Sequence, residues 1–182
     1  MGMAVSVPRY TVDDLERFPN DGDRYELLDG ILLVTPAPRA VHQNIAGRLQ
    51  LLLGTAVQRP GHARVVGPGA ISVPPRTQLQ PDILVYPARF GPSVDWISVT
   101  DHWLAVEVLS RSSRVYDREF KRDAYFALGV LQVWLVDIAD KSVEVWRARD
   151  AREVVRDVIR WRVPTLDLVV PIVLAEVFAG LE

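Results

Sequence analysis

Two acidic side chains occur where the sequence predicts buried β-strands. Asp82 opens the apolar run within residues 80–86, and Glu107 lies inside the run at residues 104–109. Both runs are short and bounded by turn-forming or polar residues, which is typical of buried strands rather than helices. A carboxylate in such a strand is costly unless it is paired or bound to a metal. We therefore expect Asp82 and Glu107 to form a divalent-metal site.

The chemistry of that site requires further groups. Hard cations such as Mg²⁺ bind oxygen ligands, commonly carboxylates together with water and substrate phosphate. Asp82 and Glu107 can supply the carboxylates, and the backbone carbonyl of Val108 is a third candidate ligand. A group must also orient the attacking water and offset charge on the phosphate. Lys121 is our candidate, because it lies on the helix predicted after the Glu107 strand, one turn before Tyr125.

The choice of lysine at position 121 is informative. The chain has 21 basic residues, and only Lys121 and Lys141 are lysine. An exposed helix face could use arginine equally well, whereas a compact ammonium approaches a water or a phosphate more closely. The alternative interpretation of Lys121 is an ordinary solvated helix surface.

Basic residues gather just before Lys121. Arg111, Arg114 and Arg118 are interleaved with acidic residues. The acids could pair with these arginines and form a salt-bridged helix surface. Alternatively, the three arginines and Tyr125 contact substrate phosphates beside the metal. For Tyr125, packing on the helix face is the competing interpretation.

Composition limits the other possibilities. The 182 residues, 49% of them hydrophobic, suffice for one domain over residues 1–182. A net charge of −2 means that binding to a polyanion would need a local basic patch. The absence of cysteine excludes disulfides and thiolate metal sites, and the three histidines lack ligand spacing for zinc. No run has the length of a signal peptide or membrane span, so we expect a cytoplasmic protein without a membrane partner.

The elements that must position these residues follow from local patterns. A capping box predicts a short helix over residues 11–18, and Asp29-Gly30 predicts a hairpin turn between strands at residues 24–28 and 31–34. Apolar spacing predicts an amphipathic helix over residues 39–57, with Val41, Ile45, Leu49, Leu52 and Ala56 toward the core. Short strands are expected at residues 63–66 and 70–73.

After the Glu107 strand, a helix is predicted over residues 115–128. Phe120, Ala124 and Leu128 would form its core stripe, and Gly129 would end it. Strands are expected at residues 132–137, 142–147 and 153–159, followed by a C-terminal helix over 174–181. The whole pattern indicates an α/β or α+β fold with a mixed central β-sheet flanked by helices.

Five segments carry a resemblance to a known family. They are RYELLDG at 24–30, PDILV at 81–85, EVLS at 107–110, Lys121 with Tyr125, and VWLVD at 133–137. In order and spacing they resemble the Uma-two family of predicted restriction endonucleases, which is similar to the PD-(D/E)XK nuclease superfamily. The resemblance covers nearly the whole chain.

The resemblance implies a restriction endonuclease-like fold with a four-stranded mixed core sheet. It further implies Mg²⁺-dependent cleavage of DNA phosphodiester bonds, with Mn²⁺ as a substitute, and a homodimer. Asp82 and Glu107 become metal ligands, Lys121 the catalytic lysine and Glu26 an accessory acid near the metal. An ordinary cross-strand contact is the alternative for Glu26.

Two positions depart from the pattern of the family. Leu109 stands where the superfamily has its lysine, so Lys121 would have to reach the site from the helix. Arg111 stands where the family often has proline. Leu109 and the near-neutral charge leave a rival function open, a non-catalytic DNA-binding or assembly module that keeps the nuclease fold. A metal-dependent phosphohydrolase acting on small nucleotides is a third possibility.

Overall fold

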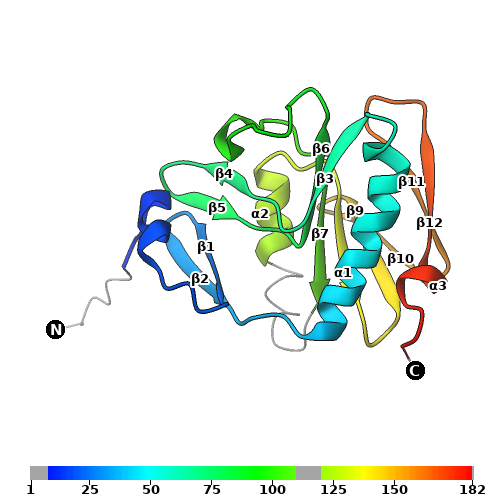
Figure 1. Ribbon diagram of the computed structural model, residues 1–182, viewed down its shortest axis with the longest axis horizontal. Helices are drawn as coiled ribbons and strands as arrows, with labels where there is room; N and C mark the ends of the chain where they lie inside the picture. Colours follow the sequence, from blue (N-terminus) through cyan, green and yellow to red (C-terminus); the bar gives the residue numbers. More distant parts are fainter. Residues whose placement is uncertain (1–7, 110–119, 182) are drawn as a thin grey trace.

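A six-stranded mixed sheet forms the centre of the molecule (Figure 1). The computed structural model describes residues 8–109 and 120–181. The strands of the central sheet are β3 (Ala63–Val66), β6 (Ile83–Pro87), β7 (Leu104–Leu109), β8 (Val133–Asp137), β9 (Ser142–Ala148) and β10 (Ala151–Val155). They lie in the order β10-β9-β8-β7-β6-β3, and only the β7–β8 pair among them is parallel. The predicted fold class is confirmed, although the described sheet has six strands rather than four.

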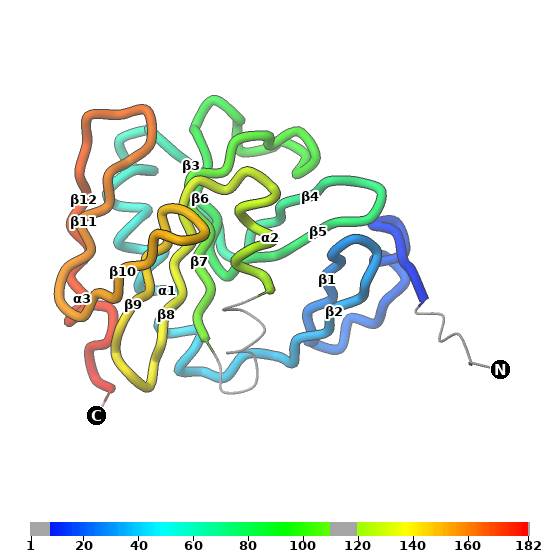
Figure 2. Tube along the Cα trace, turned by 180° about the vertical axis from the view of Figure 1, so that it is seen from behind, coloured from blue at the N-terminus to red at the C-terminus, as the bar shows by residue number. Residues whose placement is uncertain are grey.

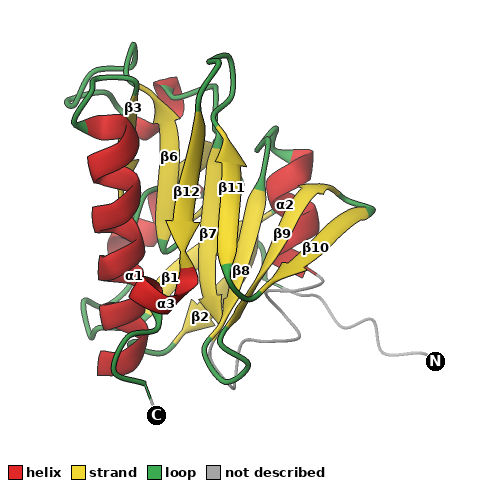
Figure 3. Cartoon of the chain, turned by 90° about the vertical axis from the view of Figure 1, so that its right-hand side faces the viewer, coloured by secondary structure: helices red, strands yellow, loops and turns green. Residues whose placement is uncertain are grey.

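The two faces of this sheet are covered differently. Helix α1 (Ala40–Leu53), the short helix α3 (Leu174–Val177) and the two-stranded sheet of β11 (Val158–Arg162) and β12 (Val169–Val173) pack on one face (Figure 3). Helix α2 (Arg122–Ala127) packs on the other. In a strand, alternate side chains point to opposite faces, so each strand contributes to both cores.

A second sheet extends the molecule on the side away from β11 and β12 (Figure 2). Its strands are β1 (Arg24–Leu28), β2 (Ile31–Thr35), β4 (Ile71–Val73) and β5 (Thr77–Leu79), in the order β2-β1-β5-β4. The predicted β1–β2 hairpin is confirmed, and Asp29 and Gly30 both have positive φ, 49° and 78°, as a type I′ turn requires. The predicted first helix is a 3-10 helix, η1 (Val12–Arg17).

Helix α1 is confirmed and continues as a π-helical turn, η2 (Gly54–Gln58). Ile45 and Leu49 are fully buried as predicted. Toward the C-terminus, however, the fully buried positions are Leu53 and Val57. The predicted positions Leu52 and Ala56 are only partly buried at the edge of the core.

The prediction for the second helix was partly wrong. Its first residues lie outside the described part of the chain, and α2 itself begins after Lys121. Phe120 is 45% exposed, whereas Lys121 and Tyr125 are buried with Ala124. The helix therefore turns a lysine inward, because acidic side chains receive it there. Gly129 follows the helix with φ +84°, as predicted.

The C-terminal third differs from the prediction in three places. The single strand expected at 153–159 is two strands, β10 and β11, which belong to different sheets and are separated by a bend at 156–157. The strand β12 was not predicted, and neither was β5 in the second sheet. The last helix is shorter than expected, since α3 ends at Val177. Among the described residues, no helix is both long and apolar enough to cross a membrane.

Candidate functional site

The β6–β7 ladder brings the two predicted acids close to each other in the central sheet. Ile83 pairs with Val106 in antiparallel register, and one further residue along this register sets Asp82 opposite Glu107. Glu107 alternates with Val106 and Val108 and points to the face covered by α2, whereas Asp82 comes directly before β6 and contacts His42 of α1. Asp82 and Glu107 are both buried, with 6% and 3% of the residue exposed. Two like charges directly opposite each other destabilise a sheet unless cations offset them.

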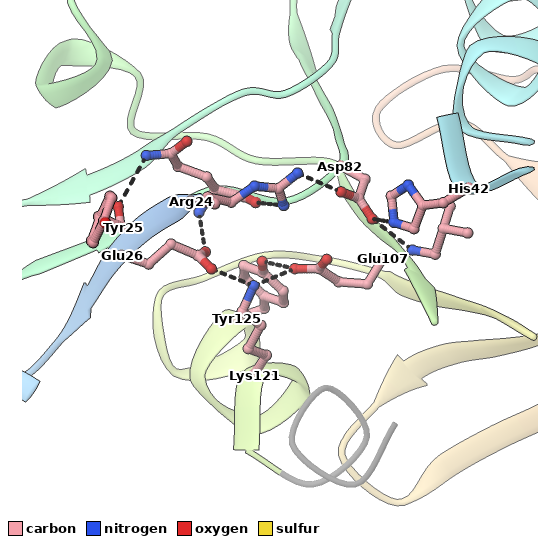
Figure 4. A network of polar contacts seen from close by, with 10 residues as sticks. Arg24, Tyr25, Glu26, His42, Asp82, Glu107, Lys121 and Tyr125 are labelled. Atoms are coloured by element: carbon pink, nitrogen blue, oxygen red, sulfur yellow. Dashed lines mark hydrogen bonds and ion pairs between the residues drawn. The ribbon is translucent and has the colours of Figure 1, made fainter. Parts of the chain in front are cut away.

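Three nitrogen donors hold Asp82 (Figure 4). Its Oδ1 accepts from Arg24 Nη2 at 2.8 Å, and its Oδ2 accepts from the Val108 N–H at 2.8 Å. His42 Nε2 lies 3.1 Å from the same Oδ2. Burial opposes ionisation, but the contact with His42 and the charge of Arg24 outweigh it and lower the pKa of Asp82 to about 2. Asp82 is therefore a carboxylate at neutral pH.

Arg24 belongs to the start of β1 in the second sheet. Its Nη1 donates to the carbonyl of Gln80 at 2.9 Å, beside the bond to Asp82. Burial disfavours the guanidinium charge, but the charges of Asp82, Glu107 and Glu26 more than offset this and raise the pKa of Arg24. The second sheet thus supplies a cation to the acids of the first.

Lys121 joins Glu107 to Glu26 (Figure 4). Its Nζ lies 3.1 Å from Glu107 Oε1 and 2.7 Å from Glu26 Oε2. The Tyr125 hydroxyl also donates to Glu107 Oε1. Glu26 is fully buried, and its Oε1 accepts from the Gln80 N–H at 2.6 Å. Acids from two sheets therefore meet one ammonium from the N-terminal end of α2.

The structure brings together five of the residues singled out from the sequence: Glu26, Asp82, Glu107, Lys121 and Tyr125. For Val108, it is the N–H that contacts Asp82, while the metal-binding role expected for its carbonyl stays a prediction. Arg111, Arg114 and Arg118 lie outside the described residues.

Sequence reasoning missed Arg24 and His42. Arg24 could have been found, because it lies two residues before Glu26 on a predicted strand and so shares its face. His42 gave no such signal. It comes from the first turns of α1, and only the tertiary fold brings it to Asp82.

The donor set fits a hard divalent cation. Within residues 8–109 and 120–181, no three His, Asp or Glu side chains are arranged to hold a metal together. Two carboxylates and a backbone carbonyl nevertheless suit Mg²⁺, which keeps several waters and takes few protein ligands. The Asp82 carboxylate is already ionised, as metal binding requires. Among the described residues, the carboxylates of Glu26, Asp82 and Glu107 also outnumber Arg24 and Lys121.

Comparison with known proteins agrees with this architecture. The sequence pattern of the Uma2 family, described as "Putative restriction endonuclease", matches residues 12–176. The chain belongs to the Uma2 family. This match confirms the resemblance to the Uma-two family that the sequence motifs indicated. No curated protein matches the chain.

A solved structure shares the fold of this Uma2 protein. It is described as a "putative nuclease belonging to DUF820 from Anabaena variabilis". The two chains are 19% identical, the match covers 92% of this chain and 97% of the other, and the TM-score is 0.71. This likeness confirms the mixed central sheet with helices on its faces.

Proposed function

We propose that this Uma2 protein is a metal-dependent endonuclease that hydrolyses DNA phosphodiester bonds. One observation carries the proposal. Asp82 directly precedes β6, Glu107 lies on the neighbouring strand β7, and Lys121 lies 3.1 Å from Glu107 although it comes from a different element. Paired carboxylates with an adjacent ammonium suit the hydrolysis of an anionic ester. The family description points to the same class of reaction.

Asp82, Glu107 and the carbonyl of Val108 would hold the cation, for which we propose Mg²⁺ with Mn²⁺ as a substitute. When bound, the cation would supply Lewis-acid chemistry, activating water and offsetting charge on the phosphate. The protein keeps Asp82 ionised through Arg24, His42 and the Val108 N–H. Oxygen-only ligands match the preference of such cations.

Lys121 would orient the attacking water by hydrogen bonding and interact with the phosphate as its charge develops. Glu26 would act as a positioning residue, because its contact at 2.7 Å holds the ammonium while the Gln80 N–H holds Glu26. The Tyr125 hydroxyl would fix the rotamer of Glu107 in the same way. A site fixed by such supporting contacts needs little rearrangement during reaction.

Cleavage of supercoiled plasmid tests the proposal. We expect nicking or cutting with Mg²⁺ or Mn²⁺, none with EDTA, and loss of cleavage in Asp82→Ala, Glu107→Ala and Lys121→Met. Glu144→Gln is a matched control, because Glu144 is a buried acid on the same sheet face as Glu107, held by Arg152 at 2.9 Å. If the two alanine variants cut as fast as the parent protein, the assignment is wrong.

Metal titration separates the enzyme from its main rival. A non-catalytic DNA-binding or assembly module would bind DNA without a Mn²⁺ site that depends on Asp82 and Glu107. Calorimetric titration of the parent protein and both variants measures this directly. We also propose a homodimer, which sedimentation analysis of the purified protein would test.

A further inference from the structure

The two oxygens of Asp82 are held in unequal ways. Oδ2 is contacted by two groups, the Val108 N–H of β7 at 2.8 Å and His42 Nε2 of α1 at 3.1 Å. Among the described residues, Oδ1 has Arg24 as its hydrogen-bond partner, at 2.8 Å. Oδ1 is therefore the oxygen that becomes available if one side chain moves.

We propose that Arg24 is a phosphate-binding residue that leaves Asp82 Oδ1 for a DNA phosphodiester when a divalent cation binds that oxygen. This role rests on the metal-dependent function proposed above. It assigns to Arg24 two successive anionic partners, first the carboxylate and then the substrate.

The chemistry of the guanidinium suits both partners. Its planar fork of N–H donors binds carboxylate and phosphate in the same bidentate geometry. A guanidinium keeps its charge throughout the physiological pH range. Arg24 can thus exchange one anion for another without a proton transfer.

The position of Arg24 favours a substrate that arrives from solvent. Its side chain is 18% exposed, compared with 3% for Lys121 and 4% for Asp82. Among the cations described in the cluster, Arg24 therefore has the best access to an incoming phosphate. Its strand also belongs to the second sheet, so its movement need not disturb the β6–β7 ladder.

Electrostatics couple the two events. A divalent cation at Asp82 repels the guanidinium that is bonded to the same carboxylate. A phosphate offers Arg24 a replacement anion, so DNA and metal should each strengthen the binding of the other. Removing Arg24 should then have opposite effects on the two ligands.

The first measurement is Mn²⁺ titration without DNA. Arg24→Gln removes the competing cation, so we expect Mn²⁺ to bind at least about threefold more tightly than in the parent protein. An arginine that only supports the fold would give the reverse, since its loss would disorder Asp82. Arg89→Gln is the control, because Arg89 forms an ion pair of similar length, at 2.7 Å but more exposed, with Asp101 beyond the other end of β6.

The second measurement is the salt dependence of binding to a short DNA duplex. With Ca²⁺ present, and the duplex shown by gel to stay intact, Arg24→Gln should reduce the slope of log K against log salt by about 0.9, the value for one lost phosphate contact. In EDTA the slope should match that of the parent protein, because Arg24 then stays on Asp82. Arg89→Gln should leave both slopes unchanged.

Three results would decide against this role. Weaker Mn²⁺ binding by Arg24→Gln would overturn it, as would a slope change of the same size with and without metal, or no change at all. Arg24→Lys retains the charge and guards against a folding failure of the glutamine variant. It should bind DNA with the parent slope but lower affinity. Absence of an Asp82-dependent Mn²⁺ site in the parent protein would instead refute the proposed function itself.

Discussion

The two faces of the central sheet are built from the same strands but have opposite chemistry. The face toward α1 is apolar along its length, with Ile83, Val85, Val106, Val108 and Trp134 fully or almost fully buried. The face toward α2 carries Glu107, Asp137 and Glu144 among its apolar residues, and Asp82 lies at the edge of the sheet beside them. Along one strand, the side chains that face α1 therefore pack in an apolar core, and the alternate side chains that face α2 include the charged groups.

Three of the buried acids in this region each form an ion pair with a cation. Asp82 meets Arg24, Glu107 meets Lys121, and Glu144 meets Arg152. Buried ion pairs seldom add net stability, because desolvation offsets the attraction. Removing a charge from these pairs should therefore cost less stability than removing a large apolar side chain from the α1 face, and this comparison can be tested by substitution on each side.

The largest expected effect is on the α2 face. Glu107→Gln keeps the shape of the side chain but removes a charged metal ligand, so we expect cleavage to fall about 1000-fold, or about 4 kcal/mol in activation free energy. Lys121 keeps Glu26 at 2.7 Å, so the free energy of unfolding should change by only about 1 kcal/mol. Single-turnover cleavage and urea unfolding measure the two quantities. A large stability loss with unchanged cleavage would reverse the comparison.

The next effect belongs to the α1 face. Trp134 is fully buried and packs edge-to-face on Trp161 with ring centroids 6.0 Å apart. Trp134→Ala should therefore lower the free energy of unfolding by about 3 kcal/mol, measured by urea unfolding. Cleavage per folded molecule should stay near that of the parent protein.

Trp134→Phe provides the control for that substitution. The indole Nε1 of Trp134 has no hydrogen-bond partner within the described chain, so phenylalanine loses volume but no polar contact. We expect a clearly smaller loss of stability than with alanine. Equal losses would mean that packing volume does not explain the role of Trp134.

A third substitution tests how rigidly Asp82 is held. A Cβ at Gly67 would lie 2.6 Å from the carbonyl oxygen of Asp82, so Gly67→Ala must shift that backbone. We expect Mn²⁺ affinity to fall about tenfold, because metal ligands tolerate little displacement. Gly47→Ala is the control, since a Cβ there meets nothing within 4 Å. Calorimetric titration of both variants would show whether the loss is specific to position 67.

Local patterns predicted much of this architecture. Alternation and turn chemistry were enough for the β1–β2 hairpin and for the strands β6 to β9. The sheet to which each strand belongs was harder to predict, because β10 and β11 are neighbours in sequence but pair with different partners. Apolar periodicity predicted that Phe120 would be buried, but Phe120 is exposed and Lys121 is buried instead. A pattern of apolar spacing cannot predict that acidic side chains in the core will pair with a lysine.

The site shows the same division between local and long-range information. Glu107 and Lys121 could be associated because a helix that follows a strand packs back on the sheet. The contact between Arg24 and Asp82 spans 58 positions, and that of His42 requires α1 to dock on the sheet. Such contacts form only when distant elements pack together, so local sequence patterns do not predict them.

The smallest expected effect concerns His102, a buried polar group that contrasts with Asp82. Within the described residues neither ring nitrogen makes a hydrogen bond of normal geometry, and burial lowers the pKa of His102 although Asp101 and the Val99 backbone partly oppose this. The unfolded chain therefore binds the proton more readily, and the free energy of unfolding should fall as the pH drops below about 6.5. Urea unfolding between pH 7.5 and 5.5 should show a shallower decline for His102→Phe than for the parent protein. The exposed His62, changed to glutamine, should leave the decline unaltered. If the free energy of unfolding of His102→Phe fell with pH as steeply as that of the parent protein, burial of His102 would not explain the pH dependence. The contrast with the paired acids would then fail.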